Sequence, residues 1–385
     1  MLHHKSLVAL VLVLCLVLAA IGCAGPKTPY KIGAIFAITG PASWLGEPER
    51  NTARMIAEEI NQAGGIDGHL LELIIEDTAG DPTNAMNAVN KLIEKDNVLA
   101  IIGPSRTGTS LAVAPICEEN EVPLISCAAA ASIVEGRRWV FKTPQRDDHA
   151  AIRILEHMRD AGIEKIGIIT GTTSFGIGGR EQLKKYAPEM GIEIIADETY
   201  GPDDADMTAQ LQKIKESGAQ AVVNWSIVPA QAIVPKNMKQ LGMDIPLYQS
   251  HGFGNIKYVE AAGEAAEGVL FPAGRLLVAE TLPEAHPQKA VLMEYKTRYE
   301  ERFSPDQVST FGGHAYDALH IVVGALKKAG ADRAKIRDAI ETTQGFVGTG
   351  GIFNYSADDH TGLTKDAFEM LIVKDGKFAR AKDVL

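Results

Sequence analysis

Residues 98–126 read VLAIIGPSRTGTSLAVAPICEENEVPLIS, and this stretch contains a complete strand–helix–strand unit. Apolar and β-branched residues at 98–102 predict a buried strand, which leads directly into the glycine-bearing loop 103–108. A helix is expected from the end of that loop to Glu119, and residues 122–126 predict the next strand. Two strands joined by a helix of this length are typical of parallel strands in one sheet.

Strands and helices alternate in the same way on both sides of this unit. The expected strands lie at residues 31–38, 71–75, 165–170, 192–196, 221–225 and 245–248, and the expected helices at 53–60, 81–95, 147–160, 180–188, 207–217 and 229–241. The two series are separated at Thr143-Pro144. Because 385 residues exceed the usual ~250–300 of a single core, the chain is predicted to be an α/β protein with two doubly wound parallel-sheet lobes.

The N-terminus predicts export. Lys5 precedes the apolar run 7–20, and a positive start, an apolar region of this length and small residues after it are typical of a signal peptide, here residues 1–22. A spanning helix would need ~20 apolar residues. The ending LAAIGC resembles a bacterial lipobox, which predicts lipidation of Cys23, a tether over residues 23–29 and a membrane-anchored exported protein. The alternative is an ordinary cleaved signal followed by a coincidental cysteine.

Composition and motifs exclude several classes of function. The formal net charge of −11 disfavours nucleic acid and anionic membrane surfaces as partners. Cys117 and Cys127 remain after the N-terminal cysteines, so no disulfide framework is expected. We find no hydrolase, metalloprotease, nucleotide-binding or redox motif and no metal-ligand spacing among the histidines. The sequence therefore predicts a binding protein without catalytic residues, cofactor or metal.

Two loops are candidates for binding a carboxylate. Ser105, Arg106 and Thr107 lie where a strand ends and the next helix begins, and free N–H groups and hydroxyls at a helix N-terminus attract anions. The alternative is a helix cap with nothing bound. In the second loop, residues 126–132, small side chains including Ala128 would let a ligand approach the backbone, or would serve close helix–strand packing.

Several motifs occur together in a characteristic order. They are Thr39-Gly40-Pro41, INQAGGI at 60–66, Asp81-Pro82, IGP at 102–104, AGEAAEG at 262–268 and FGGHAYDA at 311–318. In these motifs the chain resembles, from about Tyr30 to its C-terminus, the leucine/isoleucine/valine-binding family, which are type I periplasmic solute-binding proteins of ABC importers.

The resemblance implies a domain organisation and partners. Three crossovers near residues 143–144, 273–275 and 350–351 would join the lobes, with the ligand in the cleft between them. Lobe one would comprise residues 30–145 plus 276–349, and lobe two residues 146–275 plus 350–385. Closure of the lobes would be a hinge motion. The implied partners are a small carboxylate-bearing ligand and the ABC permease subunits in the membrane.

The family's site residues fall on positions of this chain that match only in part. Thr107 matches the hydroxyl that binds the ligand carboxylate, and Ala128 matches a backbone contact. Ala130 stands where the family has a second hydroxyl. Phe175 stands at the aromatic wall. His251 stands where the family has the acid that pairs with the ligand ammonium, and a desolvated ammonium without a carboxylate is costly.

Several interpretations of the ligand therefore stay open. Trp44 and Trp225 lie at strand ends, where they would either contact the ligand or pack within the lobes. Arg106 and His251 would together favour an acid without an amino group. The ligand is then an apolar amino acid, with Glu47 or Asp203 replacing the missing acid, or an aromatic or aliphatic carboxylic acid. A third reading is a ligand sensor on the same fold, acting on a receptor or operon partner.

Overall fold

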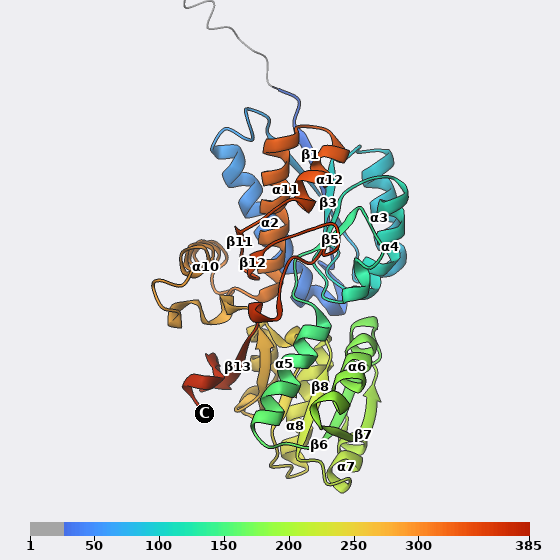
Figure 1. The fold of residues 1–385 in the computed structure, drawn as a ribbon, viewed down its shortest axis with the longest axis vertical. Helices are drawn as coiled ribbons and strands as arrows, with labels where there is room; N and C mark the ends of the chain where they lie inside the picture. Colours follow the sequence, from blue (N-terminus) through green and yellow to red (C-terminus); the bar gives the residue numbers. More distant parts are fainter. Residues whose placement is uncertain (1–26) are drawn as a thin grey trace, which may run out of the picture.

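The computed structural model describes residues 27–385, which form two α/β lobes, one above the other in Figure 1. The predicted signal peptide and Cys23 lie outside the described residues. Lobe one contains a five-stranded, all-parallel sheet in the order β2-β1-β3-β4-β5. Its strands are β1 (Tyr30–Phe36), β2 (Leu71–Asp77), β3 (Ala100–Ile102), β4 (Leu124–Ser126) and β5 (Val140–Lys142). Its helices are α2 (Ser43–Gln62), α3 (Pro82–Glu94), α4 (Thr107–Glu119), α10 (Lys289–Phe303), α11 (Thr310–Ala329) and α12 (Arg333–Glu341).

Lobe two contains a seven-stranded sheet in the order β14-β13-β10-β9-β8-β6-β7. Its strands are β6 (Lys165–Gly171), β7 (Glu193–Tyr200), β8 (Ala221–Trp225), β9 (Leu247–Gln249), β10 (Leu270–Ala273), β13 (Glu369–Lys374) and β14 (Lys377–Arg380). Its helices are α5 (Asp147–Asp160), α6 (Ser174–Tyr186), α7 (Thr208–Glu216), α8 (Ile233–Gln240) and α9 (Ile256–Ala262). β6 to β10 are parallel, whereas β13 and β14 pair antiparallel at the edge. The predicted fold class is confirmed. The two antiparallel strands at the edge of the second sheet were not part of the prediction.

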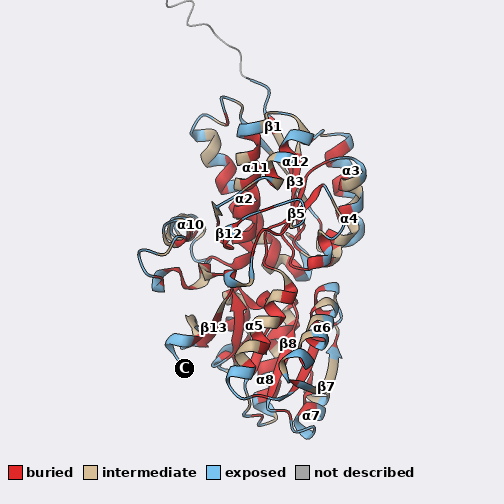
Figure 2. Ribbon diagram, viewed as in Figure 1, coloured by how far each residue is buried: buried red, intermediate tan, exposed pale blue. Residues whose placement is uncertain are grey.

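The continuous apolar strands are explained by burial on both faces (Figure 2). In lobe one, Ile102 faces a core shared with α2 and α11, while its neighbour Ile101 faces a second core shared with α3 and α4. Side chains that alternate along a strand thus serve two different cores. Because parallel strands point the same way, the loops that follow β3 and β4 meet at the edge that faces lobe two.

The chain crosses between the lobes after β5, after β10 and near the C-terminus. The expectation of a third crossover at residues 350–351 is wrong. The backbone N–H groups of Thr349 and Gly350 donate to the buried Asp317 carboxylate of α11, at 2.6 and 2.7 Å, and hold the chain on lobe one. Phe353 and Tyr355 then pack in the lobe-one core, and Phe368 is the next aromatic residue to enter the core of lobe two.

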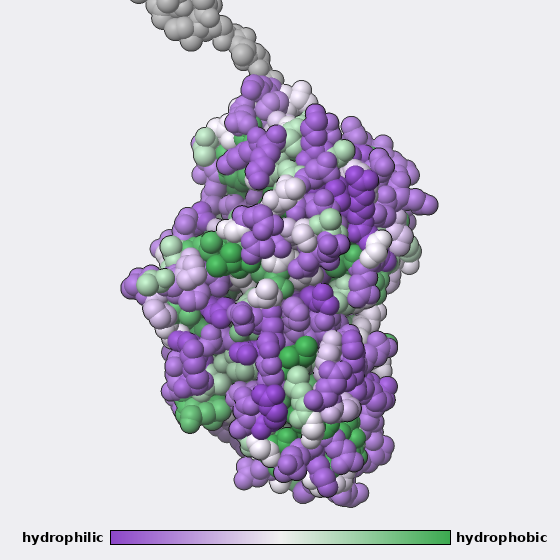
Figure 3. All heavy atoms as spheres, in the orientation of Figure 1, coloured by the Kyte–Doolittle hydropathy of each residue, from purple (hydrophilic) through white to green (hydrophobic). Residues whose placement is uncertain are grey.

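The lobes are closed upon one another. The Asn255 side-chain amide donates to the Trp44 carbonyl at 2.9 Å, and the Thr310 N–H donates to the Gly254 carbonyl at 3.0 Å. A Cβ added to Gly108 would lie 3.0 Å from the Ser174 hydroxyl, so α4 and α6 approach closely. On the face in Figure 3 the surface is continuous across the junction and mostly hydrophilic. Among residues 27–385, no helix has the length and hydropathy to cross a membrane.

Candidate ligand-binding site

A narrow cavity lies where the two lobes meet. With the lobes closed its volume is about 20 Å³, and both lobes contribute to its wall. Lobe one contributes Ser105, Thr107, Cys127, Ala128, Ala129, Phe311 and His314, with Pro144 at the first crossover; lobe two contributes Phe175, Ile227, His251 and Gly252. Five of the nine predicted contacts are therefore brought together: Ser105, Thr107, Ala128, Phe175 and His251.

Thr107 is the first residue of α4 and is buried. Within the described chain its hydroxyl oxygen has no hydrogen-bond partner, and no side chain caps the helix. Leaving a buried hydroxyl unpaired costs about 1–3 kcal/mol, so the arrangement favours a ligand that accepts this hydrogen bond. The unpaired N–H groups and the positive end of the helix dipole favour the same partner, an anion.

Ser105 serves the wall in a different way. Its hydroxyl oxygen accepts from the Ala37 N–H at 2.9 Å and its proton is donated to Glu49, a fully buried carboxyl group of α2. Ser105 is thereby fixed. Glu49 lies behind it rather than on the cavity wall, and burial raises the pKa of that carboxyl well above its usual range.

Arg106, which we expected near the ligand, is turned away from the cavity. Its guanidinium donates to the Gly80 carbonyl at 3.2 Å, and it does not belong to the cavity wall. As the residue before the first turn, Arg106 has extended backbone angles. The position of the ligand charge therefore depends on Thr107 and the helix end, and the expectation of an arginine contact does not hold in this structure.

The second loop contributes Ala128 but not Ala130. The Ala128 N–H donates to the Ser126 hydroxyl at 3.1 Å, so the loop is held by its own side chain. Ala130 packs in the core beside α3 and α4, and its carbonyl accepts from Ile133. The small residues here therefore serve close packing as well as access to the cavity.

Aromatic rings support the wall of lobe two. Phe175, in the first turn of α6, contacts His251 edge-on with ring centroids 5.2 Å apart. Trp225 is fully buried behind both, 5.9 Å from Phe175 and 5.6 Å from His251, and does not line the cavity. Trp44 contacts Tyr258 at 5.2 Å where the lobes meet, also outside the cavity. Both tryptophans thus pack within the protein, which was the alternative interpretation.

Two histidines face the cavity from opposite lobes, His251 from the turn after β9 and His314 from α11. Burial and, to a smaller extent, the nearby Lys142 lower the pKa of each to about 3. Both imidazoles are therefore neutral at physiological pH. Among the described residues that line the cavity there is no carboxylate.

The comparisons with known proteins agree with this two-lobe geometry. The family described as "Periplasmic binding protein" matches residues 29–377. This chain belongs to that family. The resemblance stated from the motifs is confirmed. The members of this family are solute-binding proteins rather than enzymes, and they are located in the periplasm.

Known members resemble this periplasmic binding protein over nearly its whole length. The leucine-, isoleucine-, valine-, threonine- and alanine-binding protein of Pseudomonas aeruginosa is 28% identical over 333 residues, 84% of each chain. An extracellular ligand-binding receptor from Rhodopseudomonas palustris HaA2 is 27% identical with a TM-score of 0.86, over 92% of this chain and 100% of that one. The protein LivJ of Streptococcus pneumoniae, solved with isoleucine, is 25% identical with a TM-score of 0.81, over 91% of this chain and 98% of LivJ.

Sequence reasoning missed several wall residues of this periplasmic binding protein. Phe311 and His314 are three apart on α11, so they share a helix face and both reach the cavity. They belong to the motif FGGHAYDA, and that spacing was the available signal. Ile227 and Cys127 follow β8 and β4, at the carboxyl ends of strands where ligands bind in such sheets.

The expected replacements for the missing acid are not found at the cavity. Glu47 faces Lys257 at 3.7 Å outside it, and Asp203 is exposed in the loop after β7. The ionisable side chain buried close to the site is instead a lysine. Lys142, the last residue of β5, donates to the Pro144 carbonyl at 2.7 Å, and burial lowers its pKa to about 7. No carboxylate of the described residues lies within ion-pair distance of it.

Proposed function

We propose that this protein captures a small hydrophobic carboxylate without a charged amino group and delivers it to an ABC importer. The observation that carries the proposal is the composition of the closed cavity. An unpartnered threonine hydroxyl and a free helix N-terminus lie in a wall with two neutral imidazoles and no carboxylate. Solute binding itself follows from the family.

The carboxylate end of the ligand is supported by Thr107. A hydrogen bond to a charged group is worth about 1.5–3 kcal/mol, more than a neutral one. The apolar side chains of Phe175, Ile227 and Phe311 would surround the hydrophobic body. A ligand of this kind pairs with the Thr107 hydroxyl of lobe one and places apolar surface against Phe175 and Ile227 of lobe two.

The charges around the cavity support a ligand that carries no ammonium group. Removing an ammonium from water without a carboxylate partner costs several kcal/mol. His251 stands where the resembling family has its acid, and Lys142 adds positive potential nearby. Both features disfavour a second cation inside the cavity.

A branched-chain amino acid is the second candidate ligand. The names of the Pseudomonas aeruginosa relative and of LivJ solved with isoleucine favour it. The buried Glu49 has one carboxyl oxygen without a partner among the described residues. A rearrangement of Ser105 would be needed to bring that oxygen to the ligand.

Direct competition between matched ligands tests the proposal. Calorimetry on the purified protein would compare leucine with 4-methyl-2-oxopentanoate and 4-methylpentanoate, which share its body and carboxylate but lack the amino group. We expect at least tenfold tighter binding of one of the deaminated acids. Tighter binding of leucine would show that the amino-acid alternative is correct.

We further propose that export ends in lipidation at Cys23. The supporting observation is the sequence LAAIGC after an apolar run. Cys23→Ser is expected to prevent acylation and release the protein from the membrane fraction. Identical mass and membrane partitioning of the two proteins would exclude the anchor.

Delivery to a permease is distinguished from ligand sensing by genetic context. Genes for an ABC permease and ATPase next to the gene of this protein would support import. Their absence, together with an adjacent receptor or regulator gene, would favour the sensor.

A further inference from the structure

His251 and His314 bring ring nitrogens without hydrogen-bond partners to the cavity wall. Both side chains are buried, with 8% and 7% of their surface exposed. Within residues 27–385, both ring nitrogens of His251 and Nδ1 of His314 have no hydrogen-bond partner. A buried donor or acceptor without a partner destabilises the protein. A ligand that binds the carboxylate site alone would leave them unpaired.

The surroundings hold both rings in place. His251 is enclosed edge-on by Phe175, Trp225 and Phe368, with centroids 5.2, 5.6 and 5.6 Å away. His314 lies one helical turn from Phe311, and its carbonyl accepts from the Thr143 hydroxyl at 2.9 Å. The His251 ring cannot turn away to find another partner without losing these aromatic contacts, whereas the bond from Thr143 fixes the backbone of His314. Both imidazoles line the cavity, so a ligand that fills it would lie against them.

The chemistry of neutral imidazole limits the ligand group. Each ring offers one N–H donor and one acceptor nitrogen. An ammonium only donates and an ionised carboxylate only accepts, whereas a hydroxyl group does both. The charged group that affects both rings is Lys142, and its positive charge opposes an ammonium at this place.

We propose that His251 and His314 together bind a hydroxyl group on the body of the ligand, away from its carboxylate. The inference rests on the proposed function and narrows it to hydroxylated hydrophobic acids, such as hydroxyphenyl or hydroxyalkyl carboxylates. One histidine accepts a hydrogen bond from the hydroxyl group, and the other donates a hydrogen bond to the hydroxyl oxygen. Because the two rings belong to different lobes, the hydroxyl joins the lobes in the closed protein.

Phenylacetate and its 2-, 3- and 4-hydroxy derivatives are suitable probes, since they differ in the hydroxyl alone. In the unaltered protein, we expect at least one hydroxylated isomer to bind roughly tenfold or more tightly than phenylacetate. His314→Leu and His251→Phe are each expected to reduce that preference to within about twofold. His314→Gln, which retains a donor and an acceptor, is expected to keep part of it.

His320→Leu is the matched control. His320 lies on the same helix, α11, packs against Tyr316 with the two rings tilted, and does not line the cavity. Its pKa is also lowered by burial, to about 4. We expect this variant to retain the full preference for the hydroxylated acid. Circular dichroism on every variant separates loss of binding from loss of folding, and His314→Gln keeps the test valid if the leucine variant unfolds.

The outcomes separate the two proposals. Equal affinity of the unaltered protein for all four acids would overturn the hydroxyl site and leave carboxylate capture intact. A preference that survives in both His314→Leu and His251→Phe would also overturn it. Binding of amino acids with no binding of any of the four acids would overturn both proposals.

Discussion

The two lobes contribute different chemical groups to the wall of the cavity. Lobe one presents the N-terminus of α4, with its unpartnered Thr107 hydroxyl, whereas lobe two presents rings and the neutral His251. The wall of lobe one suits a charge, and that of lobe two suits a hydrophobic body. On our proposal, lobe one binds the charged group, while rings of both lobes, including Phe311 and His314 of lobe one, surround the body of the ligand.

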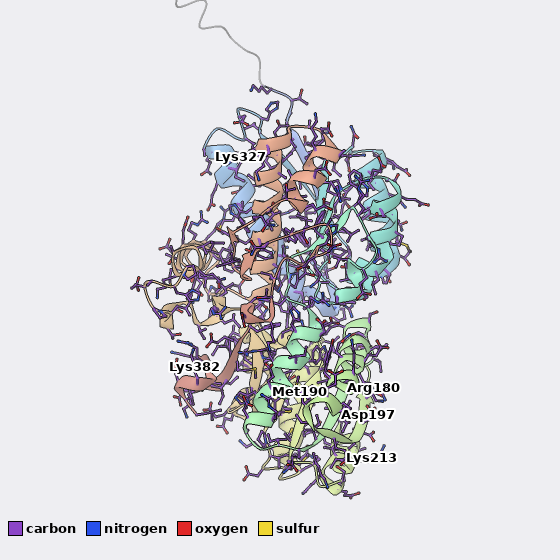
Figure 4. The ribbon with its side chains drawn as sticks, viewed as in Figure 1. Arg180, Met190, Asp197, Lys213, Lys327 and Lys382 are labelled. Atoms are coloured by element: carbon purple, nitrogen blue, oxygen red, sulfur yellow. The ribbon has the colours of Figure 1, made fainter. Side chains whose placement is uncertain are left out.

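The support behind the wall of lobe two is expected to have the largest effect. Trp225→Ala removes a fully buried ring that packs on Phe175 and His251, and such losses cost about 3–5 kcal/mol. Thermal and denaturant unfolding would measure the change. Lys327→Ala, at the exposed far end of α11 in Figure 4, is the control and should unfold like the parent protein. A loss below 1 kcal/mol in Trp225→Ala would contradict this role.

The charge site of lobe one is tested by Thr107→Val. Affinity for every carboxylate ligand should fall roughly tenfold to a hundredfold, because a hydrogen bond to a charged group is lost. Stability without ligand should not fall and should rise by up to about 1–3 kcal/mol, since the variant removes a buried hydroxyl that has no partner among the described residues. Calorimetry and unfolding measure the two effects separately.

Thr109→Val is the matched control for that test. Its hydroxyl donates to the Arg106 carbonyl at 2.9 Å and does not line the cavity. This variant should lose about 1 kcal/mol of stability and keep its affinity. If both valine variants behave alike, Thr107 does not hold the carboxylate.

The buried histidines predict a loss of stability in acid. His314 has a pKa of about 3 in the folded protein, against an ordinary value of 6.5. Between these values the unfolded chain binds more protons, so the free energy of unfolding falls with falling pH by about 1.4 kcal/mol per unit for this group. Above pH 6.5 it adds no dependence. Asp317, whose pKa burial raises to about 7, acts in the opposite direction.

The difference between the protein and His314→Leu isolates the histidine from such opposing groups. Urea unfolding at pH 4, 5, 6 and 7 should show the variant losing less stability in acid than the parent. Parallel pH profiles for the two proteins would mean that His314 is not buried as a neutral ring.

Substitutions on the outer surface of lobe two should have little effect on stability or ligand affinity. Arg180 of α6 and Asp197 of β7 form a paired contact at 2.7 Å on the outside of the lobe (Figure 4). Partly exposed ion pairs contribute about 0–1 kcal/mol. Asp197→Asn should therefore change stability by less than 1 kcal/mol and leave ligand affinity unchanged. A large change in affinity would show that selection by lobe two extends beyond its wall.

The alternation of strands and helices was predictable because each element has a local cause. The range of α5, Asp147–Asp160, and that of β8, Ala221–Trp225, coincide with the expected ones, since apolar periodicity and flanking turn residues lie within each segment. The third crossover was misplaced because its position depends on Asp317, which binds Thr349 and Gly350 from a distant helix.

The cavity wall was predictable only where a loop follows a strand. Thr107 begins the helix after β3 and Ala128 follows β4, so their positions agree with what the family resemblance implied. The direction of the Arg106 side chain depends on a carbonyl at Gly80, which no local pattern reveals. Whether Trp225 lies on the wall or behind it depends on the rings in front of it, Phe175 and His251.

The interleaving of the two lobes along the chain has a consequence for biosynthesis. A chain that emerges N-terminus first has made β6 to β10 before it makes β13 and β14, which pair with β10 and close that edge of the sheet. α11, which covers the first sheet, also comes late. Neither lobe is complete until almost the last residue has been delivered. A chain interrupted before residue 369 would carry an uncovered strand edge, which is a site for aggregation and for recognition by proteases.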